Sequence, residues 1–346
     1  MPEARVPDFA RRSLSRRGFL AGAGAVGAGA LVAACGAGSS PASVTGAGSR
    51  PWSFTDDRGT KVTSKGSPNR VVAYTGSAAA LHDFGVTNSL VGVFGPTTLP
   101  NGKADPLAGG LDVGKVTVVG NTYGEFNVES YAALRPDLLV TNMMQPGVLW
   151  YVPTNSEQQI LQLAPSIAFT SANISLLKTI GRYAELAKAL GADPNAKQVT
   201  EAKARFDSAT NALRTATATN RGIKVLAGSA AADMFYVSLP SSYPDLTYFQ
   251  SIGVEFVVPN KVTGGFFESL SWENVDKYPA DLILLDSRSE TLQPKDLSDK
   301  PSWLVLPEVK ANQITPWASE PRFSYAGCAP QIEALAAAIQ HARKVS

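Results

Sequence analysis

Short apolar runs and amphipathic segments alternate along most of the chain. The apolar runs have the length of strands, and the segments between them carry apolar residues at every third or fourth position, the spacing of a helix. This order predicts an α/β fold with mainly parallel sheets. Strands are expected at residues 71–74, 90–94, 116–119, 138–140, 167–169, 224–227, 234–237, 254–258, 282–285 and 314–316.

Three further elements complete the pattern. Apolar and polar residues alternate in residues 52–62, on both sides of the turn Asp57-Arg58-Gly59, which predicts a hairpin. Residues 174–190 have a helical pattern closed by Gly191, and the last helix is expected at about 329–343. Nothing in the pattern shows the chain returning from its second half to the first.

One long amphipathic segment, 195–218, divides the chain into two halves. Val199, Phe206 and Leu213 mark its apolar stripe, and charged residues occupy the other face. Asp193-Pro194 suits an N-cap followed by a proline in the first turn. The segment therefore predicts a single long helix.

Two segments that flank this helix match each other. Residues 127–140 and 271–284 each combine an Asn or Ser cap, a short helix, a proline turn and an apolar strand. Aligned without gaps, they match at two acidic positions, Glu129 with Glu273 and Asp137 with Asp281. We therefore expect two similar lobes joined by one rigid link that permits little hinge opening. The predicted parts are a first lobe at 52–192, a connecting helix at 193–220 and a second lobe at 221–346.

The composition suits a folded protein with two cores. The chain has 346 residues, of which 44% are apolar and 17% charged. The first 34 residues carry a net charge of +3, so the overall +2 leaves −1 for the rest. We expect no nucleic-acid partner, because the folded part offers no basic surface for a phosphate backbone.

The first 34 residues have the pattern of an export signal. Arg16-Arg17 precede a glycine- and alanine-rich apolar stretch, which resembles a twin-arginine signal. The stretch ends in Val32-Ala33-Ala34-Cys35, which resembles a bacterial lipobox and implies a lipid on Cys35 after cleavage. Residues 35–51 are rich in Gly, Ser and Ala and predict a flexible tether to the outer face of the cell membrane.

The sequence offers little for catalysis or metal binding. It contains no Gly-x-Ser-x-Gly elbow, phosphate loop or His-Glu-x-x-His motif, and its Gly-x-Gly-x-x-Gly match at 22–27 lies inside the signal. His82 and His341 are its two histidines, too few for a zinc or manganese carrier. Cys328 is interpreted as a buried core residue. We expect a binding protein that is not an enzyme and has no resident cofactor.

Together, these motifs resemble a known family of receptors. The signal, the opening Trp52-Ser-Phe-x-Asp-Asp-Arg-Gly59, the half-repeats and the connecting helix are similar to class III substrate-binding lipoproteins of ABC iron-siderophore importers. Five segments look most like desferrioxamine-binding lipoproteins: 76–85, 124–127, 149–153, 271–274 and 319–327. The resemblance implies two Rossmann-like lobes, a monomer, a ferric hydroxamate siderophore of the ferrioxamine type as ligand, and ABC permease subunits as partner.

Ligands of two-lobed α/β proteins bind beyond the carboxyl ends of the strands. A ferric tris-hydroxamate has a neutral iron core whose oxygens accept hydrogen bonds, so its complement is a planar cation between aromatic walls. Arg322 follows the last strand and is the predicted donor, and Trp150 and Tyr151 are predicted to form the opposite wall. The further candidates for ligand binding are Phe267, Arg288, Trp317 and Tyr325.

Other interpretations of these residues stay open. Arg322 can instead pair with Glu320 at the surface, and Trp150 and Tyr151 can belong to the core. The candidate loops offer only two arginines, Arg288 and Arg322, which favours a hydroxamate over a strongly anionic catecholate complex. A haem or cobalamin receptor of the same fold, and an adhesion or signalling lipoprotein, remain alternatives.

Glu129 and Glu273 suggest a second role. The family resemblance implies that a glutamate on each lobe docks onto arginines of the permease, and these two match by position and by the internal repeat. A glutamate in the first turn of a helix is also favoured by the helix dipole, without any partner. The sequence leaves open whether Tyr123 and Trp272 face the cleft.

Overall fold

The computed structural model describes residues 51–346. The predicted signal, Cys35 and the tether up to residue 50 lie outside the described residues. Within the described part, no helix combines the length and the hydropathy that a membrane crossing needs.

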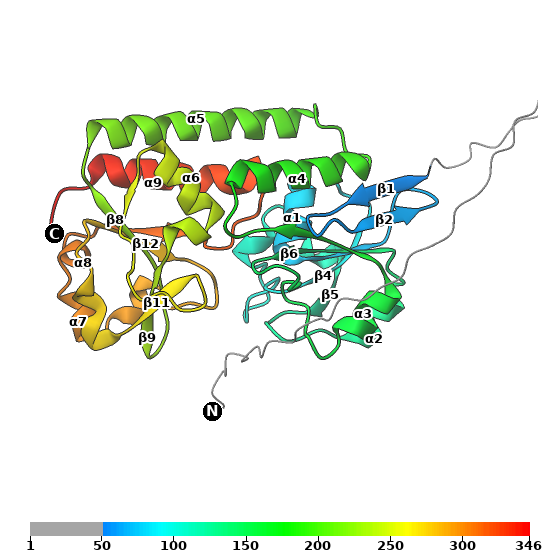
Figure 1. Ribbon diagram of the computed structural model, residues 1–346, viewed down its shortest axis with the longest axis horizontal. Coiled ribbons are helices and arrows are strands. Elements are labelled where there is room, and N and C mark those ends of the chain that lie inside the picture. The colour runs from blue at the N-terminus through cyan, green and yellow to red at the C-terminus, as the bar shows by residue number, and fades with distance from the viewer. Residues whose placement is uncertain (1–50) are drawn as a thin grey trace, which may run out of the picture. The chain divides into compact units, whose positions relative to one another are not determined.

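The first lobe is built on a five-stranded parallel sheet (Figure 1). Its spatial order is β5-β4-β3-β6-β7, with β3 (Val71–Tyr74), β4 (Leu90–Phe94), β5 (Thr117–Gly120), β6 (Leu138–Met143) and β7 (Ser166–Thr170). The predicted hairpin is confirmed as β1 (Trp52–Thr55) and β2 (Lys61–Ser64). The helical elements are α1 (Thr75–Asp83), η1 (Pro106–Ala108), η2 (Val113–Lys115), α2 (Val128–Ala133), α3 (Glu157–Leu163) and α4 (Leu176–Ala189). The strands predicted for this half are all present.

The second lobe contains a mixed six-stranded sheet. Its strands are β8 (Lys224–Ala230), β9 (Met234–Ser238), β10 (Glu255–Phe256), β11 (Phe267–Ser271), β12 (Leu282–Asp286) and β13 (Ile314–Trp317), and the main order is β11-β9-β8-β12-β13. The strands β8, β12 and β13 run parallel, whereas β9 pairs antiparallel with β8 and β11. The three residues between β8 and β9 allow only a tight turn, because a parallel crossover needs a dozen or more. The α/β fold class is confirmed, with this antiparallel edge as a difference from an all-parallel sheet.

Short helices connect the strands of the second lobe. They are η3 (Pro240–Ser242), α6 (Pro244–Ile252), η4 (Trp272–Lys277), η5 (Pro294–Leu297), α7 (Pro301–Leu304) and α8 (Pro307–Lys310). Five of them, all except η4, start on a proline. Proline suits this position because its fixed φ is helical and its missing N–H is not needed there.

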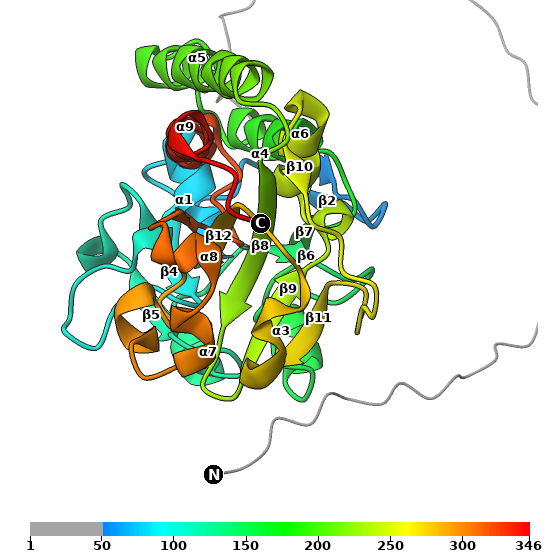
Figure 2. The same cartoon turned by 90° about the vertical axis from the view of Figure 1, so that its left-hand side faces the viewer.

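The connecting helix is confirmed as α5 (Lys197–Thr219). It buries Val199, Phe206 and Leu213, and α9 (Tyr325–His341) packs along its length (Figures 1 and 2). The predicted N-cap is wrong. The Asp193 carboxylate accepts a hydrogen bond from the Asn195 backbone instead, in a turn that precedes the helix.

The last helix begins a turn earlier than predicted and touches the first lobe. The Ser324 hydroxyl caps α9 by accepting a hydrogen bond from the backbone N–H three residues later, over 2.8 Å. Phe323 stacks on Tyr183 of α4 with ring centroids 6.3 Å apart, and Tyr325 meets the edge of Phe84 at 6.0 Å. The second half of the chain therefore does return to the first lobe, through side-chain packing that the sequence pattern did not show.

The internal repeat is visible in the structure. The Asp137 carboxylate accepts from the Arg70 backbone at 3.0 Å, and the Asp137 N–H donates back to the Arg70 carbonyl. Asp281 makes the same reciprocal pair with Lys224, at 2.9 and 2.8 Å. In each lobe, this aspartate ties the start of the central strand, β3 or β8, to the start of its neighbour, β6 or β12. The interpretation of paired halves is confirmed.

Candidate ligand-binding site

The strand order of each sheet reverses beside its central strand, and crevices at such switch points bind ligands. The reversal lies between β3 and β6 in the first lobe and between β8 and β12 in the second. A pocket of about 90 Å³ lies where these strands end, beside Tyr74 of β3 and the loop after Asp286 of β12. Both lobes line it, with Tyr74, Pro106 and Tyr151 on one side and Arg288, Glu320 and Arg322 on the other.

Four aromatic side chains form a wall on the first-lobe side of this pocket. The ring of Tyr151 lies 5.2 Å from Tyr74, 5.5 Å from Trp150 and 5.2 Å from Tyr123, measured between centroids. Tyr123 is 66% exposed and also packs against Trp150 at 5.6 Å. The wall thus offers apolar faces together with hydroxyl and indole donors.

The loop after β6 holds two of these rings in place. The Thr141 hydroxyl donates to the Trp150 backbone carbonyl at 2.7 Å, and the Trp150 backbone N–H donates to the Asn142 backbone carbonyl at 2.9 Å. Tyr151 has a φ of +60°, the left-handed region that residues other than glycine rarely adopt. Such strain persists only where surrounding contacts fix the backbone, and it clusters at functional sites.

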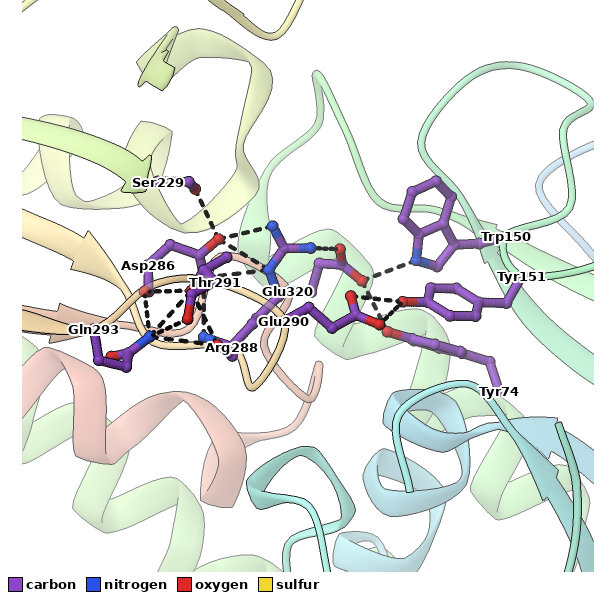
Figure 3. A network of polar contacts seen from close by, with 10 residues as sticks. All are labelled: Tyr74, Trp150, Tyr151, Ser229, Asp286, Arg288, Glu290, Thr291, Gln293 and Glu320. Atoms are coloured by element: carbon purple, nitrogen blue, oxygen red, sulfur yellow. Dashed lines mark hydrogen bonds and ion pairs between the residues drawn. The ribbon is translucent and has the colours of Figure 1, made fainter. Parts of the chain in front are cut away.

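Glu320 joins the two lobes across the pocket (Figure 3). One of its carboxylate oxygens, Oε2, accepts from the Tyr74 hydroxyl and from the Trp150 indole N–H, both at 2.8 Å. The other oxygen, Oε1, pairs with the Arg288 guanidinium. A second carboxylate, Glu290, accepts from the Tyr151 hydroxyl at 3.2 Å. Carboxylates of the second lobe therefore meet donors of the first.

Arg288 is held from behind by Asp286. Its Nη2 lies 2.7 Å from Asp286 Oδ2, and its Nε also donates to this carboxylate. Asp286 is fully buried and accepts a further hydrogen bond from the Ser229 hydroxyl at 2.7 Å. The guanidinium is thus fixed between a buried carboxylate and the pocket-lining Glu320.

The tyrosine hydroxyls of this network stay protonated. Burial, and then the Glu320 carboxylate, raises the pKa of Tyr74 well above its ordinary value. Burial also raises the pKa of Tyr151, with the Glu320 and Glu290 carboxylates adding to the effect. Both groups therefore act as hydrogen-bond donors, and the carboxylates act as acceptors. Burial raises the pKa of Glu290 as well.

Arg322 reaches across to the first lobe. Its Nε lies 3.3 Å from Asp83 Oδ2, and its Nη1 donates to the Pro106 carbonyl at 3.3 Å. Gly109, with a φ of +57°, lies against the guanidinium, since a Cβ at this position would come within 2.5 Å of the guanidinium carbon. The alternative pairing of Arg322 with Glu320 is wrong, because Glu320 pairs with Arg288.

The sequence between residues 71 and 321 matches the periplasmic binding protein family. The chain belongs to this family. Periplasmic binding proteins are exported substrate-binding proteins rather than enzymes. This agrees with a site made of hydrogen-bond donors, acceptors and rings between two lobes.

Three relatives of this periplasmic binding protein show how widely the fold is shared. The solved structure of DesE, a ferric-siderophore receptor from Streptomyces coelicolor, is 51% identical, with a TM-score of 0.83 over 85% of this chain and 100% of that one. The petrobactin-binding protein YclQ of Bacillus subtilis is 18% identical, with a TM-score of 0.64 over 84% and 99% of the chains, which shows the fold alone. The Fe(3+)-citrate-binding protein YfmC of Bacillus subtilis is 26% identical over 262 residues, 75% of this chain and 76% of that protein.

The structure brings four of the seven predicted ligand-binding residues of this periplasmic binding protein together. Tyr151, Arg288 and Arg322 line the pocket, and Trp150 contacts its lining residue Glu320. Tyr123, left open by the sequence, belongs to the aromatic wall.

The other three predicted ligand-binding residues lie elsewhere. Trp317 is fully buried, and its indole N–H donates to the buried Asp245 at 2.6 Å, so this ring belongs to the core. Phe267 lies on β11, where its ring packs on Tyr236 at 4.9 Å, away from the pocket lining. Tyr325 starts α9 and packs under α5, against Phe84 and Phe206.

Trp272 also belongs to the core of the second lobe. It is 7% exposed, and its indole N–H donates to the Ala232 carbonyl at 3.0 Å. Glu129 and Glu273 are both exposed and lie in the first turns of α2 and η4, equivalent positions in the two lobes. Their predicted docking role stays a prediction.

Sequence reasoning missed Tyr74, Glu290 and Glu320 as site residues. Tyr74 ends a predicted strand at a switch point, which is a usable signal. Glu320 was considered only as a partner of Arg322, because its first-lobe partners lie 170 and 246 positions away. Among residues 51–346, no group of three or more His, Cys, Asp or Glu side chains is arranged to hold a metal ion. Cys328 is fully buried, as interpreted.

Proposed function

We propose that this protein captures a ferric hydroxamate siderophore of the ferrioxamine type for an ABC importer. Its likeness to a ferric-siderophore receptor at 51% identity supports the iron-siderophore class. The family binds substrates without converting them, so the complex would be passed on chemically unchanged.

The pairing of both pocket arginines with carboxylates is the observation that carries the hydroxamate assignment. Arg288 is paired with Asp286 and Glu320, and Arg322 is paired with Asp83. Anionic chelates, such as ferric catecholates and ferric citrate, need several cations that are free to converge on them. A neutral hydroxamate core needs donors and apolar walls instead, which Trp150 and Tyr151 supply.

The pocket must enlarge to hold such a ligand. Its volume of about 90 Å³ is below the roughly 300–1,000 Å³ of ordinary ligand sites. The contacts that close it are hydrogen bonds between side chains, including those of Glu320 and Glu290 to first-lobe rings. Opening therefore requires these side chains or the lobes to shift. The free energy needed for this shift is small compared with that of unfolding a core.

Titration of the purified protein with ferrioxamine B and ferrioxamine E tests the assignment. We expect quenching of tryptophan fluorescence with a dissociation constant below about 1 µM. Ferric citrate and a ferric tricatecholate serve as anionic comparators, and haem is followed by its Soret band. Absence of ferrioxamine binding, or a haem complex of higher affinity, would overturn the proposal.

The proposal includes export and anchoring through the first 35 residues. Arg16-Arg17 would direct export, and a lipid on Cys35 would hold a monomer at the outer face of the membrane. A Cys35→Ser variant is expected to appear in the medium rather than in the membrane fraction. An unchanged membrane fraction would contradict lipid anchoring while leaving ligand binding untouched.

A further inference from the structure

A short segment between two fixed points carries Glu320 into the pocket. Trp317 is anchored in the second lobe by its hydrogen bond to Asp245, and Arg322 is anchored in the first lobe by Asp83. Only two residues, Ala318 and Ser319, lie between β13 and Glu320, so this segment has little conformational freedom. The Glu320 side chain is only 11% exposed, and its place beside Arg288 is set by the fold.

The two carboxylate partners of Arg288 differ in position. Asp286 is fully buried behind the guanidinium, and Ser229 holds it there. Glu320 lines the pocket itself, in contact with Nη1 of Arg288. The side of the Arg288 guanidinium that faces the pocket is therefore already paired with Glu320 before a ligand enters.

Resting on the proposed function, we infer that Glu320 is a specificity-determining residue that excludes anionic iron chelates. It occupies the N–H group with which Arg288 would otherwise bind a carboxylate or catecholate oxygen. It also places a negative charge in a partly buried pocket, where repulsion of an anion is stronger than in water. A neutral hydroxamate complex meets neither barrier, because its oxygens can accept from Trp150 and the tyrosines.

Specificity of this kind rests on the rejection of the wrong ligand as much as on attraction of the right one. A second carboxylate of this network, Glu290, accepts a hydrogen bond from the pocket-lining Tyr151 and is not paired with an arginine. It carries the same charge in the same network, so it provides a matched comparison. If blocking Arg288 is the mechanism, then removing the charge at Glu320 has a larger effect than removing it at Glu290.

The test is a comparison of Glu320→Gln with Glu290→Gln in the full mature chain. Glutamine keeps an oxygen for the Tyr74 and Trp150 donors but cannot form an ion pair with Arg288. Affinities for ferric citrate, as the anionic probe, and for neutral ferrioxamine E are measured by calorimetry. We expect the ratio of citrate to ferrioxamine E affinity to rise at least tenfold in Glu320→Gln, and at most threefold in Glu290→Gln. Adding Arg288→Gln to Glu320→Gln should cancel the rise.

Two results would overturn the role of Glu320. One is an unchanged ratio in Glu320→Gln, which would make the residue a structural contact between lobes. The other is an equal rise in both variants, which would mean that net charge alone sets the selectivity. These outcomes differ from failure of the proposed function, which would appear as absence of ferrioxamine E binding by the unaltered protein.

Discussion

The indole nitrogen of Trp150 donates a hydrogen bond to Glu320 Oε2 over 2.8 Å, although the two residues lie 170 positions apart in opposite lobes. This bond makes one ring serve two purposes. The ring belongs to the aromatic wall, and its N–H helps to hold the lobes together. Substitutions at Trp150 can separate these purposes.

Trp150→Phe keeps a ring in the wall but removes the donor, whereas Trp150→Ala removes both. We expect Trp150→Ala to weaken ferrioxamine binding at least tenfold more than Trp150→Phe, because ring contact supplies most of the ligand-binding energy. Both variants should lose about 1.5–3 kcal/mol of unfolding free energy from the bond to the Glu320 carboxylate. Calorimetric titration and urea denaturation measure the two effects. Equal affinities for the two variants would remove the ring from the ligand site.

Arg322 and Asp83 form an ion pair between the lobes, with 3.3 Å between Nε and Oδ2. If Arg322 also donates to the ligand, Arg322→Gln should weaken ferrioxamine binding by about 1.5–3 kcal/mol, the value of a hydrogen bond to a charged group. Asp83→Asn breaks the same pair but leaves the guanidinium in the pocket, so its effect on affinity should be several-fold smaller. Titration of both variants with ferrioxamine measures the two losses of affinity, and thermal melts serve as a control for folding. Matching losses of affinity would reduce Arg322 to a structural contact.

Glu129 and Glu273 are exposed in the first turns of α2 and η4, and η4 packs against α7. In Figure 1, α2 and α7 both lie on the side of the molecule away from α5. We expect the pair Glu129→Lys and Glu273→Lys to abolish siderophore uptake by cells, because both substitutions repel basic residues of a permease. Ligand affinity of the purified variant should stay unchanged, since neither residue lines the pocket.

A control variant for uptake carries the same charge reversal at two other exposed glutamates, Glu201 of α5 and Glu255 of β10. It changes the net charge equally, and uptake should remain normal. Normal uptake by the Glu129 and Glu273 variant would refute docking through these residues.

The apolar pattern was sufficient to predict the connecting helix and the strands that are buried on both faces, because such burial requires continuous apolar runs. It missed β11, an edge strand in which buried and more exposed residues alternate. The same pattern could not separate cleft from core for single aromatic residues. Trp317 and Trp150 both follow or end a strand, yet Trp317 lies inside because α6 brings the buried Asp245 to its indole nitrogen. That partner lies 72 positions away in the sequence, so the residues around Trp317 do not predict it.

The polar network was beyond sequence reasoning for a related reason. Glu320 becomes a neighbour of Tyr74 and Trp150 only when the two lobes face each other. Arg322 was correctly expected at the pocket, but its local neighbour in sequence, Glu320, turned out to pair with Arg288 instead. Pairing by proximity in sequence fails where a segment crosses from one lobe to the other.

The buried carboxyl of Asp245 gives the protein a defined dependence of stability on pH. It lies on α6, its Oδ2 accepts from Trp317, and its Oδ1 has no hydrogen-bond partner among the described residues. Burial raises the pKa of Asp245 to about 7, despite the opposing hydrogen bond from Trp317. The folded protein therefore holds this proton more tightly than the unfolded chain does.

The sign of the effect follows from this difference in proton binding. The contribution of Asp245 to stability is fully present below about pH 4, falls as the pH rises toward about 7, and stays low above that. The loss over this window is on the order of 4 kcal/mol for a shift of about three pKa units. The side chain of Asp245→Asn cannot titrate, so the unfolding free energy of this variant should lack this decline. The difference in unfolding free energy should therefore shift in favour of the variant as the pH rises. Urea denaturation at several pH values between about 4 and 8 measures both curves. Parallel curves for the two proteins would show that Asp245 is ionised in the folded protein at all these pH values. Its buried charge would then be stabilised by surrounding groups and not removed by protonation.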